Sequence, residues 1–184
     1  MTLAERNPTP ESPFDFTSES PFNIKAEECV ITSLLLDQEQ LADVEDMLEP
    51  THFYIEKHRR FYKAILSLWR KQEIIDSVTL LEELRTTNQV ESDDFLNIAR
   101  LMMDYPGYGL AVGQYATIVR RDALRREMIQ VSKQLHQLAR DAENATDLVD
   151  KAESVITQAT QSYRIGSKFS DMPEIVGEIK HYIH

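Results

Sequence analysis

The fold is decided by residues 110–142, which read LAVGQYATIVRRDALRREMIQVSKQLHQLARDA. This stretch contains no proline and only one glycine, Gly113, close to its start. Its main apolar series recurs at spacings of four, three, four and three, the pattern of one helix face. The series is Leu124, Met128, Val131, Leu135 and Leu138. The spacing therefore predicts a single long amphipathic helix.

A second helix is expected after a short polar link, residues 141–146, with Thr146 as its cap. Its apolar residues repeat the same spacing: Leu148, Ala152, Val155 and Ala159. Matching seams and a short link predict an antiparallel helical hairpin over residues 109–164, too short to be called a coiled coil. Each helix also has a second apolar line, Ile118 with Ile129 and Val149 with Ile156. A lone hairpin would leave these lines in water, so it should pack on the head or on another copy.

Residues 23–108 predict a globular head of short helices. Asn23 is the expected N-cap of the first, the second spans residues 39–48, and the third spans residues 56–71. Asp76 and Ser92 are the expected caps of the fourth and fifth. A turn at residues 104–109 follows. The apolar stripes of these helices are the predicted core: Ala26, Val30, Leu34, Leu41, Val44, Leu48, Phe61, Ile65, Leu68, Trp69, Leu80, Leu81, Leu84, Phe95, Ile98 and Met102.

The two ends of the chain differ from this helical body. Residues 1–22 are rich in Pro, Ser, Thr and Glu, which predicts a flexible arm. Residues 165–184 predict a linker and the start of another amphipathic helix, which ends without a stop signal and is expected to continue beyond His184. The apolar residues of that linker helix are Ile175, Val176, Ile179 and Ile183.

Composition restricts the class of protein. The 184 residues are 42% hydrophobic and 28% charged, which is a soluble globular balance, and only five are glycine. Strand-forming clusters are scarce, so the expected fold class is all-α. No apolar run approaches the roughly 20 residues of a membrane span, and the N-terminus is not a secretory signal, so a cytoplasmic location is expected. The net charge of −11 is concentrated in residues 1–50, which hold 12 acids and 2 bases and should repel nucleic acid.

No catalytic, cofactor or metal site is predicted. There is no Gly-Lys pair from which to build a phosphate-binding P-loop, and no histidine is followed by glutamate. His52 and His58 flank a helix start without a nearby cysteine or an evident carboxylate partner, so capping or surface packing is favoured over a metal role. Cys29 lies on an apolar stripe and is interpreted as a core residue. The spacing of the carboxylates in residues 37–49 does not match that of a calcium-binding loop. They are interpreted as a solvated face or as a docking face for a basic partner.

Two basic clusters leave alternatives open. The first contains Lys57, Arg59, Arg60, Lys63, Arg70 and Lys71, interleaved with Tyr62 and Trp69. It could contact DNA, but pairing with acidic helix faces of the same chain is favoured. The second contains Arg120, Arg121, Arg125 and Arg126. The acids of the following helix lie too far along the hairpin to neutralise it fully, so an acidic partner on another chain is a hypothesis.

A family resemblance rests on six stretches in order. They are Lys25-Ala-Glu-Glu through Leu36-Asp37, Phe53-Tyr54 with His58-Arg59, Ile75-Asp-Ser-Val-Thr-Leu, Tyr115-Ala-Thr-Ile-Val-Arg, Arg126-Glu-Met-Ile-Gln-Val and Asp147-Leu-Val-Asp-Lys-Ala-Glu-Ser. Together they resemble the N-terminal domain of the bacterial replicative DNA helicase, DnaB, over residues 21–184. One departure is Asp93-Asp94-Phe95, where the family usually has Gly-Gly before an aromatic residue.

The resemblance implies that hairpins pair between subunits, as a homodimer or a hexameric ring, and that the heads form a collar. It implies recruitment of the primase C-terminal domain, leaves recruitment of a helicase loader open, and implies weak or no DNA contact by this chain. ATP and Mg would belong to a separate ATPase domain, on which the linker helix docks. The expected subunit or partner interface consists of Leu124, Met128, Val131, Leu135, Leu138, Leu148, Val149, Val155, Ile156, Arg125 and Arg126.

Two other functions compete with this docking module. A stand-alone protein of the same fold could bind helicase or primase as a regulator. A small enzyme using His52 and His58 or the acidic cluster is disfavoured, because the sequence shows no pattern of a nucleophile with its base or of a set of metal ligands.

Overall fold

The computed structural model describes residues 20–104, 112–142 and 144–165, and within these ranges the fold is all-helical, without a strand. The predicted fold class is confirmed. The head contains α1 (Ile24–Leu36), the 3-10 turn η1 (Gln38–Gln40), α2 (Leu41–Val44), η2 (Pro50–His52), α3 (Glu56–Arg70), α4 (Ser77–Thr86) and α5 (Asp94–Asp104). It is followed by α6 (Val112–Asp141) and α7 (Ala145–Ile165). No helix in the described ranges combines the length and apolarity needed to cross a membrane.

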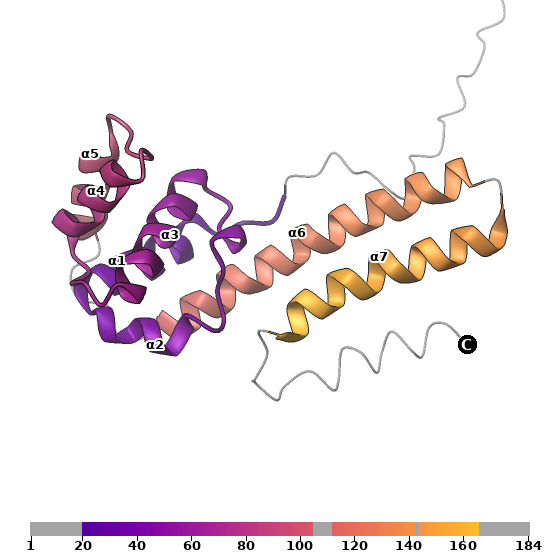
Figure 1. The fold of residues 1–184 in the computed structure, drawn as a ribbon, viewed down its shortest axis with the longest axis horizontal. Coiled ribbons are helices and arrows are strands. Elements are labelled where there is room, and N and C mark those ends of the chain that lie inside the picture. The colour runs from indigo at the N-terminus through magenta and orange to yellow at the C-terminus, as the bar shows by residue number, and fades with distance from the viewer. Residues whose placement is uncertain (1–19, 105–111, 143, 166–184) are drawn as a thin grey trace, which may run out of the picture.

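The long helix α6 belongs to both parts of the molecule. Its first turns pack against α1 and α2 inside the head, and its remainder projects outward with α7 running back alongside it (Figure 1). The predicted linker helix lies outside the described residues. So do most of the predicted arm and all of the predicted turn at residues 104–109 except Asp104. The proposed divisions at residues 22, 108 and 164 stay predictions.

One apolar core holds the head together and takes side chains from every long helix of the head and from α6. Val30, Ile31 and Leu34 of α1 pack with Phe61 and Ile65 of α3, all with no exposed surface. The other fully or almost fully covered members include Leu41, Val44, Leu48, Phe53, Tyr62, Leu68, Leu80, Leu84, Ile98, Leu101, Ala116 and Val119. Each large aliphatic or aromatic side chain contributes about 2 kcal/mol by leaving water. Cys29 is buried beside this core, as expected, and burial raises the pKa of its thiol.

Two helix starts form as the sequence predicts. The Asn23 side chain accepts the Ala26 N–H at 3.0 Å. Asp76 accepts the N–H groups of Val78 and Thr79, both at 2.8 Å, and the Thr79 hydroxyl accepts the Asp76 N–H in return. These contacts satisfy backbone donors that have no partner inside their own helix.

Three local predictions are wrong. The expected helix over residues 39–48 is broken: α2 ends at Val44, whose carbonyl accepts the N–H groups of both Met47 and Leu48 as the chain turns. Its predicted inward residues are nevertheless buried. The cap of α7 is Asn144 rather than Thr146, because the Asn144 side chain accepts the Thr146 N–H at 2.9 Å.

The third error concerns α5. This helix begins at Asp94, and the carbonyl of Asp93, not Ser92, accepts the first helical N–H, from Asn97. Phe95, predicted to face the core, is 65% exposed, whereas Ile98 is buried as expected. Asp94 itself is fully buried and accepts from the guanidinium of Arg60 at 3.0 and 3.1 Å. This ion pair turns Asp94 inward, and the next side chain therefore points to solvent.

We expect the α3–α4 contact to weaken in acid. The buried Glu83 carboxylate accepts from Lys71 Nζ and Ser67 Oγ, both at 2.6 Å. The Lys71 hydrogen bond, followed by that of Ser67, holds the pKa of Glu83 below its ordinary value of 4.5. Because the folded-state pKa is lowered, this stabilisation is present above the unfolded value and is lost as the pH falls through the folded one.

The Glu83→Gln variant should therefore be less stable than the parent at pH 7 by about 1 to 2 kcal/mol, a value discounted because Lys71 is partly exposed. Urea unfolding at pH 7, 5 and 3 should show this difference shrinking as the pH falls. Glu82→Gln is the matched control, since Glu82 is exposed and its ion pair is with the equally exposed Arg85. A Glu83→Gln difference that stays constant down to pH 3 would contradict the assignment.

Candidate functional site

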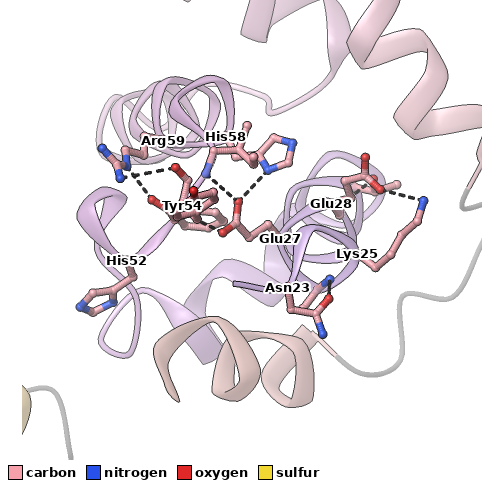
Figure 2. A network of polar contacts seen from close by, with 12 residues as sticks. Asn23, Lys25, Glu27, Glu28, His52, Tyr54, His58 and Arg59 are labelled. Carbon is pink, nitrogen blue, oxygen red and sulfur yellow. Dashed lines mark hydrogen bonds and ion pairs between the residues drawn. The ribbon is translucent and has the colours of Figure 1, made fainter. Parts of the chain in front are cut away.

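A buried carboxylate organises the junction between the head and the hairpin. Glu27 of α1 is 2% exposed, and it accepts the backbone N–H groups of Tyr54 and Ile55 at 2.6 and 3.2 Å. Its Oε2 also lies 2.9 Å from Nδ1 of His58 on α3 (Figure 2). Because an ionised carboxylate only accepts, His58 donates from Nδ1. One side chain of α1 thus fixes both the loop before α3 and the first turn of α3.

The predictions that His58 lacks a carboxylate partner and packs on the surface are therefore wrong, since its side chain is buried against Glu27. The partner, Glu27, lies 31 residues earlier in the chain. His52 has a different environment: its Nδ1 accepts the Glu49 N–H at 3.0 Å. Burial lowers the pKa of His52; Glu49 opposes this, and the positive charges of Arg120 and Arg126 add to it. The ring acts here as a local hydrogen-bond acceptor through Nδ1.

Arg126 connects α6 to the same loop. Its guanidinium donates to the carbonyl oxygens of Pro21 and His52, at 2.9 and 2.5 Å. It also lies over the Tyr54 ring, 5.6 Å from the centroid, and that ring stacks on Phe22 at 4.5 Å. Arg126, predicted to face a partner chain, thus has intramolecular partners that hold the projecting helix to the head.

The other arginines of the α6 cluster are Arg120, Arg121 and Arg125, and two of them form ion pairs within the chain. Arg121 and Arg125 both approach the buried Asp122, at 3.1 and 3.5 Å, while remaining more than half exposed. The acid that pairs with these two arginines lies inside the cluster itself, rather than on the following helix. Arg120, in the same cluster, is almost fully buried.

Three cations of the basic face of α3 pair with acids elsewhere in the head, as the favoured interpretation expected. Lys57 pairs with Asp93 at 2.6 Å, and Arg60 and Lys71 pair with Asp94 and Glu83. Glu91, Asp93 and Asp94 are the described acids grouped closely enough to hold a metal ion, but each already pairs with a cation of α3. Their arrangement is that of a salt-bridge network rather than a ligand set.

The two hairpin seams meet, and a second line stays uncovered. On α6, the side chains of Leu124, Val131, Leu135 and Leu138 are half-buried, and that of Met128 is 37% exposed. They face α7, on which Leu148, Ala152 and Val155 are half-buried and Ala159 is buried. By contrast, Val149 and Ile156 are 56% and 46% exposed. On α6, Ile118 packs against the head core and Ile129 is half-buried, so the exposed part of the second line lies on α7.

Comparison with known proteins identifies the family to which this architecture belongs. The sequence model of the DnaB-like helicase N-terminal domain matches residues 19–121, more than half of the chain. The chain belongs to this family. Among curated relatives of the DnaB-like N-terminal domain, the replicative DNA helicase DnaB of Leifsonia xyli is 29% identical over 146 residues, covering 79% of this chain and 32% of that protein. DnaB of Geobacillus stearothermophilus is 27% identical over 157 residues, covering 85% and 34%.

A solved structure agrees with these relatives. The N-terminal domain of DnaB helicase from Mycobacterium tuberculosis matches with a TM-score of 0.72 at 28% identity, covering 77% of this chain and 99% of that one. The resemblance seen in the sequence is thus confirmed in both family and fold. The chain spans about a third of the length of the Leifsonia and Geobacillus relatives. The site of interest is therefore the surface of a DnaB-like N-terminal domain.

Proposed function

We propose that this chain is the subunit-association and docking module of a replicative DNA helicase. Its hairpins would pair between copies, giving a homodimer or a hexameric ring, and its heads would form a collar that recruits the C-terminal domain of primase and, in turn, a helicase loader. It would act in the cytoplasm. The observation that carries the proposal is the exposed line of Val149 and Ile156 along α7.

Hairpin dimensions support an interface of this kind. At 1.5 Å per residue, α6 and α7 are roughly 45 and 30 Å long, enough for a standard interface of about 1,200–2,000 Å². Val149 and Ile156 are seven residues apart and so lie on one face of α7. Covering them by the same line of another copy would remove two β-branched side chains from water.

The motor activity would belong to another part of the parent helicase. These residues do not fit ATP, because no Gly-Lys pair exists from which to form a phosphate-binding loop. We expect ATP and Mg²⁺ to be held by a separate ATPase domain, on which the predicted linker helix would dock through Ile175, Val176, Ile179 and Ile183. Nothing in this chain is assigned a step of ATP hydrolysis.

Self-association through the outer line is directly testable. The double variant Val149→Ser/Ile156→Ser should weaken the Kd of self-association by about 10- to 100-fold, since each truncation at a packed interface costs about 1 kcal/mol or more. Sedimentation equilibrium over a concentration series measures this change. Gln158→Ser is the matched control, because Gln158 is exposed on the opposite side of α7. A monomeric parent at high concentration, or an unchanged Kd in the double variant, would contradict the proposal.

A stand-alone regulator of the same fold is the second candidate. It rests on the match to the solved Mycobacterium tuberculosis N-terminal domain, 99% of which this chain covers. Blotting source cells with an antibody to this chain separates the two candidates. A product near ~50 kDa would carry an additional domain of roughly 200–250 residues and support the helicase module. A product of 21.3 kDa would support the regulator.

A further inference from the structure

Helix α6 is buried in the head over its first part only. Its buried residues all precede residue 123, although the helix extends to Asp141; they are Val112, Ala116, Val119, Arg120 and Asp122. The remainder leaves the head and runs beside α7 (Figure 1). The direction in which the hairpin points therefore depends on the contacts that hold α6 at the edge of the head.

One guanidinium provides such a contact, about one helical turn beyond the last buried residue of α6. Arg126 donates to the carbonyl oxygens of Pro21 and His52, at 2.9 and 2.5 Å, and lies over the Tyr54 ring. The Phe22 ring stacks on that of Tyr54, with 4.5 Å between the centroids and 8° between the planes. We refer to these five residues as the clasp and to residues 20–22 as the strap. The clasp joins the strap, the loop before α3 and the middle of α6.

The two sides of the clasp are held unequally. The loop before α3 is firmly fixed, because Glu27 accepts two of its backbone N–H groups and Arg59 donates to the carbonyl of Phe53, whose side chain has no exposed surface. On the strap, Pro21 has no backbone N–H to donate, and Phe22 is 39% exposed. Segments with few buried apolar contacts open at the lowest free energy. The strap is therefore the part of the clasp that opens first.

The strap and α6 depend on each other through Arg126. This side chain is half-buried, and burial lowers the pKa of its guanidinium, since water solvates the charge less well there. The carbonyls of Pro21 and His52 accept the charge-assisted hydrogen bonds that replace this solvation. When the strap leaves, Arg126 loses one of these two acceptors. It regains a hydrogen bond to water by moving outward with α6.

We propose that the strap is the releasable half of a clasp that sets the direction of the hairpin relative to the head. With Phe22 seated on Tyr54, Arg126 holds α6 against the loop before α3. With Phe22 released, α6 swings about the edge of the core, near Asp122, while the head keeps its fold. Such a device is a hinge biased by a short segment with two positions. The clasp acts inside one chain, so this inference goes beyond the proposed pairing of hairpins and does not depend on it.

Distances between two spin labels test the clasp in the full chain. One label is attached on the head at Thr86→Cys and the other on α6 at Gln134→Cys, both exposed positions. A Cys29→Ala background removes the one native thiol. Labelled chains are diluted into an excess of the same variant without labels, so that double electron–electron resonance measures distances within one chain. The parent should give one narrow distance distribution.

Phe22→Ala should broaden this distribution by about twofold or more, because it removes the ring that seats the strap. Phe22 is partly exposed and lies outside the head core, so the variant should keep the fold of the head. Phe14→Ala is the matched control, since residues 11–14 repeat the tetrapeptide Glu-Ser-Pro-Phe of residues 19–22. It should leave the distribution unchanged.

Arg126→Ala gives a second, independent variant of the clasp and should broaden the distribution equally. Its control is Arg125→Ala, which removes the same charge from the neighbouring, more exposed residue of α6 and should have no effect. A second label pair, Thr86→Cys with Glu39→Cys, lies wholly within the head and should keep the parent's distribution in Phe22→Ala.

An unchanged head-to-hairpin distribution in Phe22→Ala overturns the proposal, as does equal broadening in Phe14→Ala. Broadening of the pair within the head in Phe22→Ala also overturns it, because the strap would then hold the head itself together. Sedimentation equilibrium on the same samples keeps the two proposals apart. A monomeric parent in which Phe22→Ala still broadens the head-to-hairpin distribution would reject the pairing of hairpins alone.

Discussion

Glu27→Ala is expected to lower the free energy of unfolding by about 3 to 5 kcal/mol, with a fall in Tm of roughly 10 °C. The substitution removes the acceptor of three donors at once: the N–H groups of Tyr54 and Ile55 and the ring of His58. Each donor that is left buried without a partner costs about 1–3 kcal/mol. Thermal and urea unfolding followed by circular dichroism measure the effect.

Glu39→Ala is the matched control for this experiment. Glu39 is a glutamate of the following turn η1, and its side chain is exposed, so its removal should change stability by no more than about 0.5 kcal/mol. Glu27→Gln keeps one acceptor oxygen and should fall between the two. A Glu27→Ala protein within 1 kcal/mol of the parent would show that Glu27 does not organise the junction.

The same substitution should loosen the attachment of the hairpin. Arg126 donates to the carbonyl of His52, only two residues before the loop that Glu27 holds. If that loop moves, the acceptor of Arg126 moves with it. Hydrogen exchange in Glu27→Ala should therefore accelerate in the middle of α6 as well as at residues 53–56, whereas Glu39→Ala should leave α6 unchanged.

The helices were predictable because their signals are local. An N-cap such as Asn23 or Asp76 interacts with residues two or three positions ahead, and the hairpin seams repeat every three or four residues. The Glu27–His58 contact joins residues 31 positions apart, and sequence spacing carries no information on it. One signal was available: Glu27 lies at helical spacing with Val30, Ile31 and Leu34, and a carboxylate on an apolar face requires a buried partner.

Helix α5 shows the opposite case, in which a correct periodicity led to the wrong face. Phe95 and Ile98 are spaced for one stripe, but the buried face is set by Asp94, which is drawn into the head by Arg60. A buried ion pair outweighs one aromatic side chain here, because a charge without its partner is far costlier to bury than a Phe is to expose. Sequence patterns that count only apolar residues miss this choice.

Val131→Asp/Leu135→Asp is expected to separate the two hairpin helices and abolish self-association. Both residues are half-buried in the seam of α6 against α7. Two unpaired carboxylates at that seam should destabilise the hairpin by more than about 4 kcal/mol. This exceeds the free energy that holds an isolated pair of helices together. Neither residue belongs to the head core, so the head should retain its cooperative unfolding. Circular dichroism at 222 nm and light scattering report the two effects.

Gln130→Asp/Gln134→Asp provides a control with the same added charge on the same helix. Gln130 and Gln134 are exposed and lie away from the seam, so this variant should keep both its helicity and its mass in solution. The comparison separates loss of packing from electrostatic repulsion, which both variants share. If the seam variant also kept its helicity and mass, Val131 and Leu135 would not be the residues that join the helices, and the interface would have to be built from another face of the hairpin. If only the mass fell while helicity stayed, the same residues would join copies of the chain rather than the two helices of one hairpin.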